Sequence, residues 1–141
     1  MFNLQQYKAI LATTAKPARR QDEAQLQQTC VQWWRSHRIL KPHQLVMIPN
    51  EGQRSAAMHA KMLSMGLVPG APDMFCVRPD GKIGYFEFKA PKGKPSEDQL
   101  NFAGWCADLK LPYYLIRTFA EFEAAAMALY GPYYKAGRIR A

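Results

Sequence analysis

A short hairpin near the middle of the chain constrains the fold more than any other feature of the sequence. Two strand-like runs, 73–77 and 83–90, are joined by the turn 78–82 (RPDGK). Proline at its second place and glycine at its fourth predict a type I turn closed by a left-handed glycine, the three-residue hairpin with a bulge. So short a loop fixes the strand register. Counting back from the turn places Asp73 directly opposite Glu87 on one face, with side-chain stems ~5 Å apart.

The second strand of this hairpin separates apolar from charged side chains. Alternation sends Phe86 and Phe88 to one face and Glu87 and Lys89 to the other. Two neighbouring carboxylates repel each other unless a cation lies between them, and hard oxygen ligands suit Mg²⁺. A lysine beside such a metal would position a water or stabilise charge on a phosphate. A solvated pair on the open face of an edge hairpin gives the same alternation, so both interpretations stay open.

The rest of the chain alternates helical and strand-like patterns without an internal repeat. The predicted elements are a helix over 22–36, a strand over 44–48, a helix over 55–65, the two hairpin strands, a helix over 96–110, a strand over 113–117 and a helix over 119–130 that stops at Gly131 and Pro132. At 141 residues the chain has the length of one domain. This order predicts a single mixed α/β domain.

The charge balance is typical of a protein with a polyanionic partner, although a soluble basic protein without such a partner has the same balance. Lysine and arginine number 19 against 11 aspartate and glutamate, which gives a net charge of +8. We expect three regions: a basic N-terminal arm (1–20), the folded domain (21–131) and a basic, tyrosine-rich tail (132–141). Three basic residues of the tail are expected to contact nucleic acid phosphates: Lys135, Arg138 and Arg140.

Several classes of protein are excluded by composition. No uncharged run approaches the ~20 apolar residues of a membrane span, so no membrane association is expected. The three cysteines are far apart and form no Cys-x-x-Cys pair, so they imply neither a disulfide framework nor a zinc cluster. We expect an intracellular, cytoplasmic protein.

The motifs around the hairpin occur in a recognisable order. Residues 70–73 (GAPD) precede the hairpin, and Glu87-Phe88-Lys89, a basic loop and 96–99 (SEDQ) follow its turn. This constellation resembles the PD-(D/E)XK nuclease superfamily, and within it the VRR-NUC family of virus-type replication-repair nucleases. Three further ordered elements strengthen the resemblance, which covers roughly 22–130: Glu23 with Gln27, 49–52 (PNEG) with Arg54, and Gly66-Leu67. The resemblance implies an α/β fold with a PD-(D/E)XK nuclease-like core, a central mixed β-sheet of about four strands flanked by helices.

The resemblance also assigns roles to residues of the hairpin. It implies that Asp73 and Glu87 are metal ligands, with the backbone carbonyl of Phe88 as a possible further ligand, and that Lys89 is the catalytic lysine. Glu23 resembles the additional acidic residue of the site, which contacts the metal through water or holds a second metal. The alternative interpretation of Glu23 is a helix-start residue favoured by the helix dipole.

Other assignments lie outside the hairpin. Gln99 resembles the helical glutamine of the family, but Ser96 and Gln99 also have the spacing of a capping box, and both interpretations stay open. Four further residues are candidate DNA contacts: Asn50, Arg54, Lys92 and Lys94.

The function that the resemblance implies is a Mg²⁺- or Mn²⁺-dependent DNA endonuclease of bacterial or phage type. It implies a homodimer acting on branched DNA such as four-way (Holliday) junctions, with Trp33 or Trp34 and the tail tyrosines as candidate interface residues. One alternative is a nicking or restriction-like nuclease on duplex or flap DNA. Another is a non-catalytic basic DNA-binding module whose carboxylate pair is structural.

Overall fold

The computed structural model describes residues 23–41, 44–49 and 55–135, and their elements follow the predicted order. The helices are α2 (Glu23–Ser36), α3 (Ala56–Ser64), α4 (Glu97–Asp108) and α5 (Phe119–Lys135), and the strands are β1 (Leu45–Met47), β2 (Met74–Val77), β3 (Ile83–Phe88) and β4 (Tyr113–Ile116). In these ranges no helix is both long enough and apolar enough to span a membrane. The predicted N-terminal arm lies outside the described residues.

The four strands form one mixed sheet in the order β1-β2-β3-β4. Strands β1, β2 and β3 are antiparallel neighbours, whereas β4 runs parallel to β3. Met74 pairs with Phe86, and the Arg78 N–H donates to the Lys82 carbonyl across the turn at 2.8 Å. Gly81 has the left-handed φ of 80° that the turn requires. The predicted hairpin and its register are therefore confirmed.

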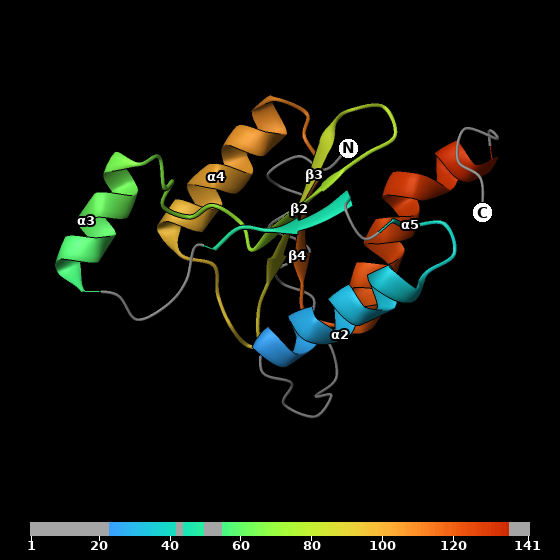
Figure 1. Ribbon diagram of the computed structural model, residues 1–141, viewed down its shortest axis with the longest axis horizontal. Coiled ribbons are helices and arrows are strands. Elements are labelled where there is room, and N and C mark those ends of the chain that lie inside the picture. The colour runs from blue at the N-terminus through green and yellow to red at the C-terminus, as the bar shows by residue number, and fades with distance from the viewer. Residues whose placement is uncertain (1–22, 42–43, 50–54, 136–141) are drawn as a thin grey trace.

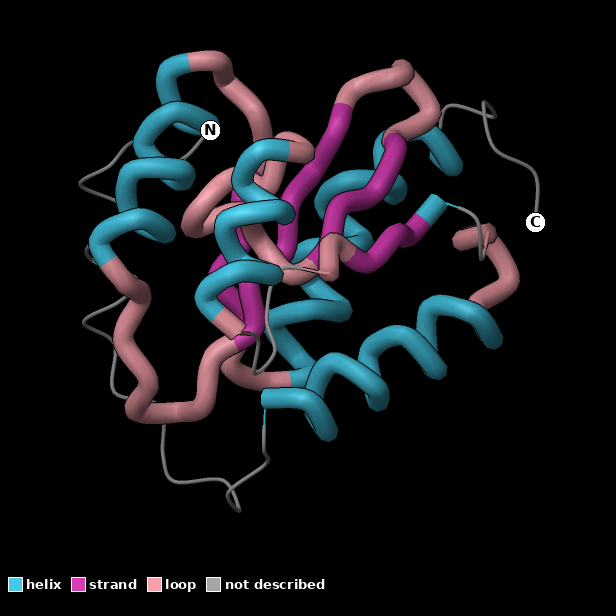
Figure 2. Tube along the Cα trace, turned by 60° about the vertical axis from the view of Figure 1, so that its left-hand side comes forward, coloured by secondary structure: helices cyan, strands magenta, loops and turns pink. Residues whose placement is uncertain are grey.

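Strand alternation decides which helix covers which face of the sheet. Helices α2 and α5 pack together on one side and α4 lies on the other (Figures 1 and 2). The rings of Phe86 and Phe88 meet Phe122 of α5 on the first side. Tyr85, one residue along β3, meets Phe102 of α4 on the second. Glu87 shares the face of Tyr85, so the sheet directs its carboxylate toward α4.

The main core lies between the sheet and the α2–α5 layer. Leu26, Cys30 and Trp34 recur every four residues along α2, and all three are buried. The Trp34 ring lies against Phe86 and Tyr130. Because Trp34 is fully buried, it cannot contribute to the dimer surface for which it was a candidate.

The last helix extends beyond the predicted stop. Helix α5 continues through Gly131 and Pro132 to Lys135, so the predicted end at residue 130 is wrong. An interior proline removes one backbone hydrogen bond, and a tertiary contact compensates here. The Tyr133 hydroxyl donates to Asp80 at 2.6 Å and accepts from Arg78 at 2.9 Å, which fixes the final turn on the β2–β3 turn.

Helix α3 stands apart from both layers (Figure 1). Ser55 caps its start and accepts from the Met58 N–H, but none of its residues is buried. It exposes Met58 and Leu63, and the segment after it exposes Met65 and Val68. These exposed apolar side chains are therefore not buried against the sheet or the other described helices.

We predict that stability falls with rising pH above about 9. Burial raises the pKa of Cys30 and Cys106 to about 12 and that of Cys76 to about 11, from an ordinary value of 9.0. Between these values the unfolded thiols lose protons that the folded protein retains, which favours unfolding by about 1 kcal/mol per thiol at pH 10. Urea unfolding at pH 8 and 10 measures the effect.

The matched control replaces all three cysteines by alanine. This variant should be less stable at both pH values because of the cavities that it creates. Its free energy of unfolding should nevertheless fall less between pH 8 and 10 than that of the wild type. If the free energy of unfolding falls equally between pH 8 and 10 in the two proteins, the pH dependence does not come from the thiols.

Candidate active site

A buried ion pair forms the centre of the candidate site. Glu87 on β3 is 0% exposed, and Lys89, two residues along the same face, is 8% exposed. The Lys89 ammonium lies 3.0 Å from Glu87 Oε1. A buried charge costs several kcal/mol unless a partner compensates it, so each of these residues requires the other. A solvated pair on an open sheet face is thereby excluded.

Gln99 contacts the same carboxylate oxygen. Its side-chain amide donates to Glu87 Oε1 at 2.5 Å, while its own oxygen accepts from the Ser96 N–H at 2.9 Å. The Ser96 hydroxyl accepts in turn from the Gln99 N–H, which completes a capping box. The two interpretations of Gln99 are therefore compatible, because the helix cap uses one atom of the amide and the contact with Glu87 uses the other.

Asp73 is attached to the strand that carries this pair. Continuing the register of β2 and β3 by one residue places Asp73 opposite Glu87, as the hairpin predicts. Its Oδ2 accepts from the Phe88 N–H at 2.7 Å, and its carbonyl accepts from the Ile48 N–H at 2.8 Å. Unlike Glu87, Asp73 is partly exposed. One carboxylate of the pair is thus buried and the other reaches solvent.

A glycine brings the segment before Asp73 against the start of α4. Gly70 has a φ of 75°, and a Cβ at this position would lie 2.2 Å from the Asp98 carbonyl carbon and 2.6 Å from the Gln99 nitrogen. Both the backbone conformation and the space therefore require glycine here. This close approach fixes the distance between the chain that leads into Asp73 and the helix that carries Gln99.

Two residues from distant parts of the chain hold the loop after Lys89. Glu23, at the start of α2, accepts from the Ala90 N–H at 2.8 Å. The Arg117 guanidinium donates to the carbonyls of Ala90 at 2.8 Å, Pro91 at 3.3 Å and Gly93 at 2.7 Å. Sequence reasoning missed Arg117. Only its position in the sheet could have indicated this role. Ile116 pairs with Phe88 in the parallel β3–β4 ladder, so Arg117 follows directly and lies beside the end of β3.

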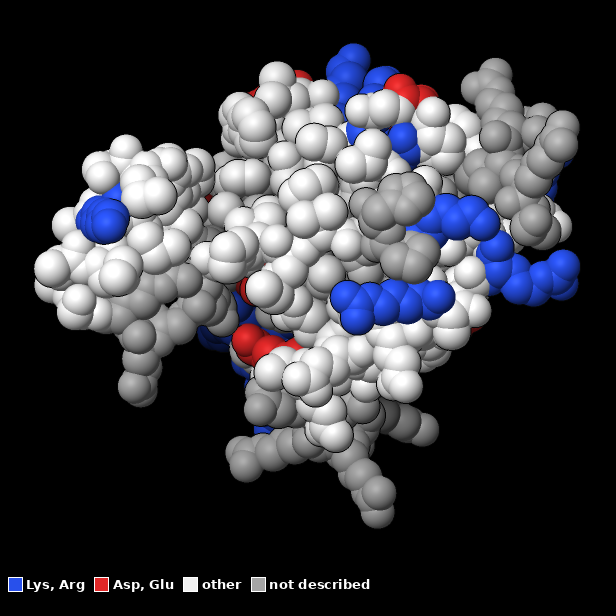
Figure 3. Space-filling model, viewed as in Figure 1, with Lys and Arg blue, Asp and Glu red and all other residues white. Residues whose placement is uncertain are grey.

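The predicted DNA contacts fall into three groups. Lys92 and Lys94 are exposed on the loop that Glu23 and Arg117 hold. Lys135 is exposed at the end of α5, which packs near the turn of the hairpin and thus far from Glu87 along the strands. The others lie outside the described residues: Asn50, Arg54, Arg138 and Arg140. Figure 3 shows acidic and basic surface side by side in a hollow near the start of α2.

The oxygen atoms at this centre match the preferences of a hard cation. Asp73 and Glu87 supply carboxylates from neighbouring strands, and the Phe88 carbonyl lies between Glu87 and Lys89 along the backbone. Oxygen ligands of this kind suit Mg²⁺, which retains several waters when bound. The described residues contain no group of three or more His, Cys, Asp or Glu side chains placed to hold a metal. A role for Glu23 toward a metal through water therefore stays a prediction, and its direct contact is with Ala90.

Comparison with known proteins supports the fold. A solved structure described as a VRR_NUC domain protein superimposes with a TM-score of 0.64 at 14% sequence identity, over 82% of this chain and 90% of the other. Neither a protein-family profile nor a curated protein matches the sequence. At this identity the similarity establishes a shared fold, the mixed α/β core that the order of predicted helices and strands indicates.

We predict that Arg117→Lys loosens the loop after Lys89. Lysine keeps the charge but cannot reach three carbonyls with one planar group. Hydrogen exchange should accelerate at Ala90 and Gly93, and the free energy of unfolding should fall by about 1–3 kcal/mol. Arg35→Lys, on the exposed face of α2, is the control and should change neither. Unaltered exchange at Ala90 and Gly93 in the Arg117 variant would contradict the assignment.

Proposed function

We propose that this protein is a Mg²⁺- or Mn²⁺-dependent DNA endonuclease of the VRR-NUC type that hydrolyses phosphodiester bonds. One observation carries the proposal: a buried Glu87–Lys89 pair lies beside Asp73 within a fold that matches a VRR_NUC domain protein. A net charge of +8 favours a nucleic acid substrate. We propose that it acts inside the cell, in the repair or recombination of DNA.

Each residue at the centre has a defined task in this proposal. Asp73 and Glu87, with the Phe88 carbonyl, would hold the cation. When bound, the cation would lower the pKa of a water and neutralise charge on the scissile phosphate. Gln99 fixes the orientation of Glu87 through their 2.5 Å hydrogen bond. The Lys89 ammonium lies 3.0 Å from Glu87 Oε1 and is placed to stabilise negative charge that develops on the phosphate.

The loop after Lys89 supplies the expected contacts with the DNA backbone. Lys92 and Lys94 project from a segment whose backbone Glu23 and Arg117 restrain. A restrained loop loses less conformational entropy on binding than a free one, so its lysines are suited to grip the phosphates next to the cut. Asn50 and Arg54, with the tail residues Lys135, Arg138 and Arg140, are proposed as further contacts.

Two alternatives within DNA binding give different experimental outcomes. In a non-catalytic basic DNA-binding module, the Glu87–Lys89 pair would be structural, and DNA binding would persist without metal-dependent cleavage. A nicking or restriction-like nuclease would use the same residues but cut linear duplex or flap DNA as fast as branched DNA. The proposed specificity for branched DNA therefore needs its own test.

We propose four-way junctions as the preferred substrate and a homodimer as the active form. One domain has one site, whereas resolving a junction requires paired nicks on symmetry-related strands, which a two-fold dimer supplies. Exposed apolar side chains on and after α3, among them Met58 and Met65, are of the kind that protein interfaces bury. Tyr130 is buried and cannot contribute to such a surface.

We predict that Asp73→Asn abolishes cleavage and preserves the fold. Asparagine retains an oxygen that accepts from the Phe88 N–H but removes the charge that a cation requires. Cleavage should fall by at least about 10²–10³-fold, while DNA affinity changes little. A cleavage assay with Mg²⁺ or Mn²⁺ measures the rate, and circular dichroism checks the fold.

Asp108→Asn, on the exposed last turn of α4, is the matched control for that variant. It should cleave like the wild type. Full activity of Asp73→Asn would reject the site. Metal-independent DNA binding by a wild type that does not cleave would favour the non-catalytic module instead.

We further predict a dimer that prefers junctions. Light scattering should return twice the chain mass of 16.1 kDa. With Mg²⁺, paired nicks on a four-way junction should appear faster than cleavage of linear duplex with the same sequence. A monomer that cuts both substrates equally fast would remove the junction proposal and leave the general nuclease.

A further inference from the structure

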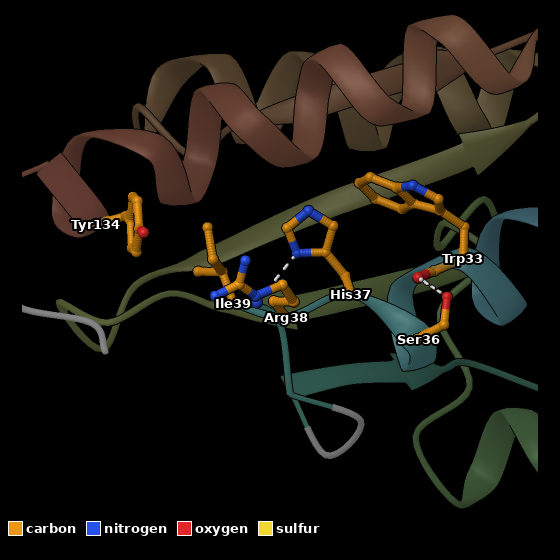
Figure 4. A pocket seen from close by; sticks show the side chains of 6 residues that line it. All are labelled: Trp33, Ser36, His37, Arg38, Ile39 and Tyr134. Atoms are coloured by element: carbon orange, nitrogen blue, oxygen red, sulfur yellow. Dashed lines mark hydrogen bonds between the residues drawn. The ribbon is translucent and has the colours of Figure 1, made fainter. Parts of the chain in front are cut away.

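A pocket opens at the end of α2 that is remote from the candidate active site. Its volume is about 350 Å³, and it is lined by Trp33, Ser36, His37, Arg38, Ile39 and Tyr134 (Figure 4). Trp33 and Tyr134 lie at opposite ends of this group, with the His37 ring between them. The volume falls in the range of small-molecule sites, which begins at ~300 Å³. The residues of the buried Glu87–Lys89 pair do not line this pocket.

Its aromatic walls are held in place by packing. The Trp33 ring lies 4.9 Å from the His37 ring and contacts Phe119 edge-on at 5.7 Å. The His37 Nδ1 accepts from the Ile39 N–H at 3.2 Å, which fixes the imidazole within the loop. Tyr134 comes from the last turn of α5 and is 43% exposed. One end of the pocket is therefore rigid, and the other presents an accessible aromatic ring.

The charge around the pocket is entirely positive in the segments that form it. Residues 35–41 and 131–135 contain four basic residues and no acid: Arg35, Arg38, Lys41 and Lys135. All four are exposed. Figure 3 shows basic side chains gathered over the later part of α2 and the loop that follows. An anionic ligand with a flat ring satisfies both the charge and the aromatic walls.

We propose that this pocket binds an unpaired nucleobase of single-stranded DNA together with its phosphate. Binding of single strands combines a positive surface that follows the backbone with aromatic side chains on which bases stack. Arg38 lines the pocket itself and supplies the cation, while Tyr134 and Trp33 supply stacking surface. A base within duplex DNA has no free face, so the pocket selects unpaired strands.

The inference rests on the proposed function and refines its substrate. Glu23 begins α2 next to the candidate active site, and Ser36 ends the helix at the pocket. Fourteen residues of helix separate the two sites by ~20 Å. At the 3.4 Å per nucleotide of one strand in duplex DNA, this distance corresponds to about six nucleotides of paired DNA. Among branched substrates, we therefore expect preference for those with an unpaired base about six nucleotides from the cut.

The test measures the affinity of the full chain for DNA by fluorescence anisotropy, in EDTA so that no cleavage occurs. The probes are an eight-nucleotide oligo(dT) and a duplex long enough to remain fully paired at the assay temperature. Tyr134→Ala should weaken oligo(dT) binding by about 5- to 150-fold, as expected for the loss of one base–aromatic stack, and should leave duplex binding unchanged. Tyr134→Phe retains the ring and should bind like the wild type. Arg38→Gln should lower the salt slope on oligo(dT) by about 0.7.

Trp105→Ala is the matched control, because Trp105 is 49% exposed on α4, on the other side of the sheet. It should bind oligo(dT) like the wild type. Unchanged oligo(dT) affinity in Tyr134→Ala overturns the inference, as does an equal loss on duplex. Cleavage of a four-way junction and of linear duplex with Mg²⁺ is measured in parallel: cleavage of either by a protein whose Tyr134→Ala variant binds normally rejects the pocket and retains the nuclease. Absence of cleavage rejects the nuclease instead.

Discussion

The carboxylate of Glu87 is the constraint on which the rest of the site depends. It is 0% exposed, so it must be compensated within the protein, and Lys89 and Gln99 both contact the same oxygen. Removing one partner of such a buried pair typically costs about 3–5 kcal/mol. These contacts determine where α4 lies, because Gln99 can reach Glu87 only if its helix begins directly above the Tyr85–Glu87 face of the sheet.

The surrounding elements are joined to this centre through backbone groups rather than through further charges. Asp73 binds the Phe88 N–H, and Glu23 binds the Ala90 N–H. Arg117 binds three carbonyls of the following loop. Since these three residues come from three different segments, the positions on either side of Glu87 and Lys89 are fixed from several directions. Rigid support of this kind holds reactive groups in place when a substrate binds.

Much of this arrangement follows from local sequence. Proline and glycine in the turn 78–82 set the hairpin register, and the register places Asp73 opposite Glu87. Alternation along β3 separates the core phenylalanines from the charged pair. The end of α5 and the role of Arg117 were not predictable in the same way. The first depends on Tyr133 contacting Asp80 more than fifty residues earlier, and the second on parallel pairing of β4 with β3. Neither contact leaves a trace in the neighbouring sequence.

The central claim is that Asp73 and Glu87 form one cation site, and anomalous diffraction from crystals soaked in Mn²⁺ tests it most directly. The account predicts an anomalous peak within coordination distance of both carboxylates, with Gln99 still bound to Glu87. A Mn²⁺ peak elsewhere on the protein would contradict it. The absence of any Mn²⁺ peak at these two carboxylates, in crystals soaked at a Mn²⁺ concentration that supports cleavage, would also contradict it.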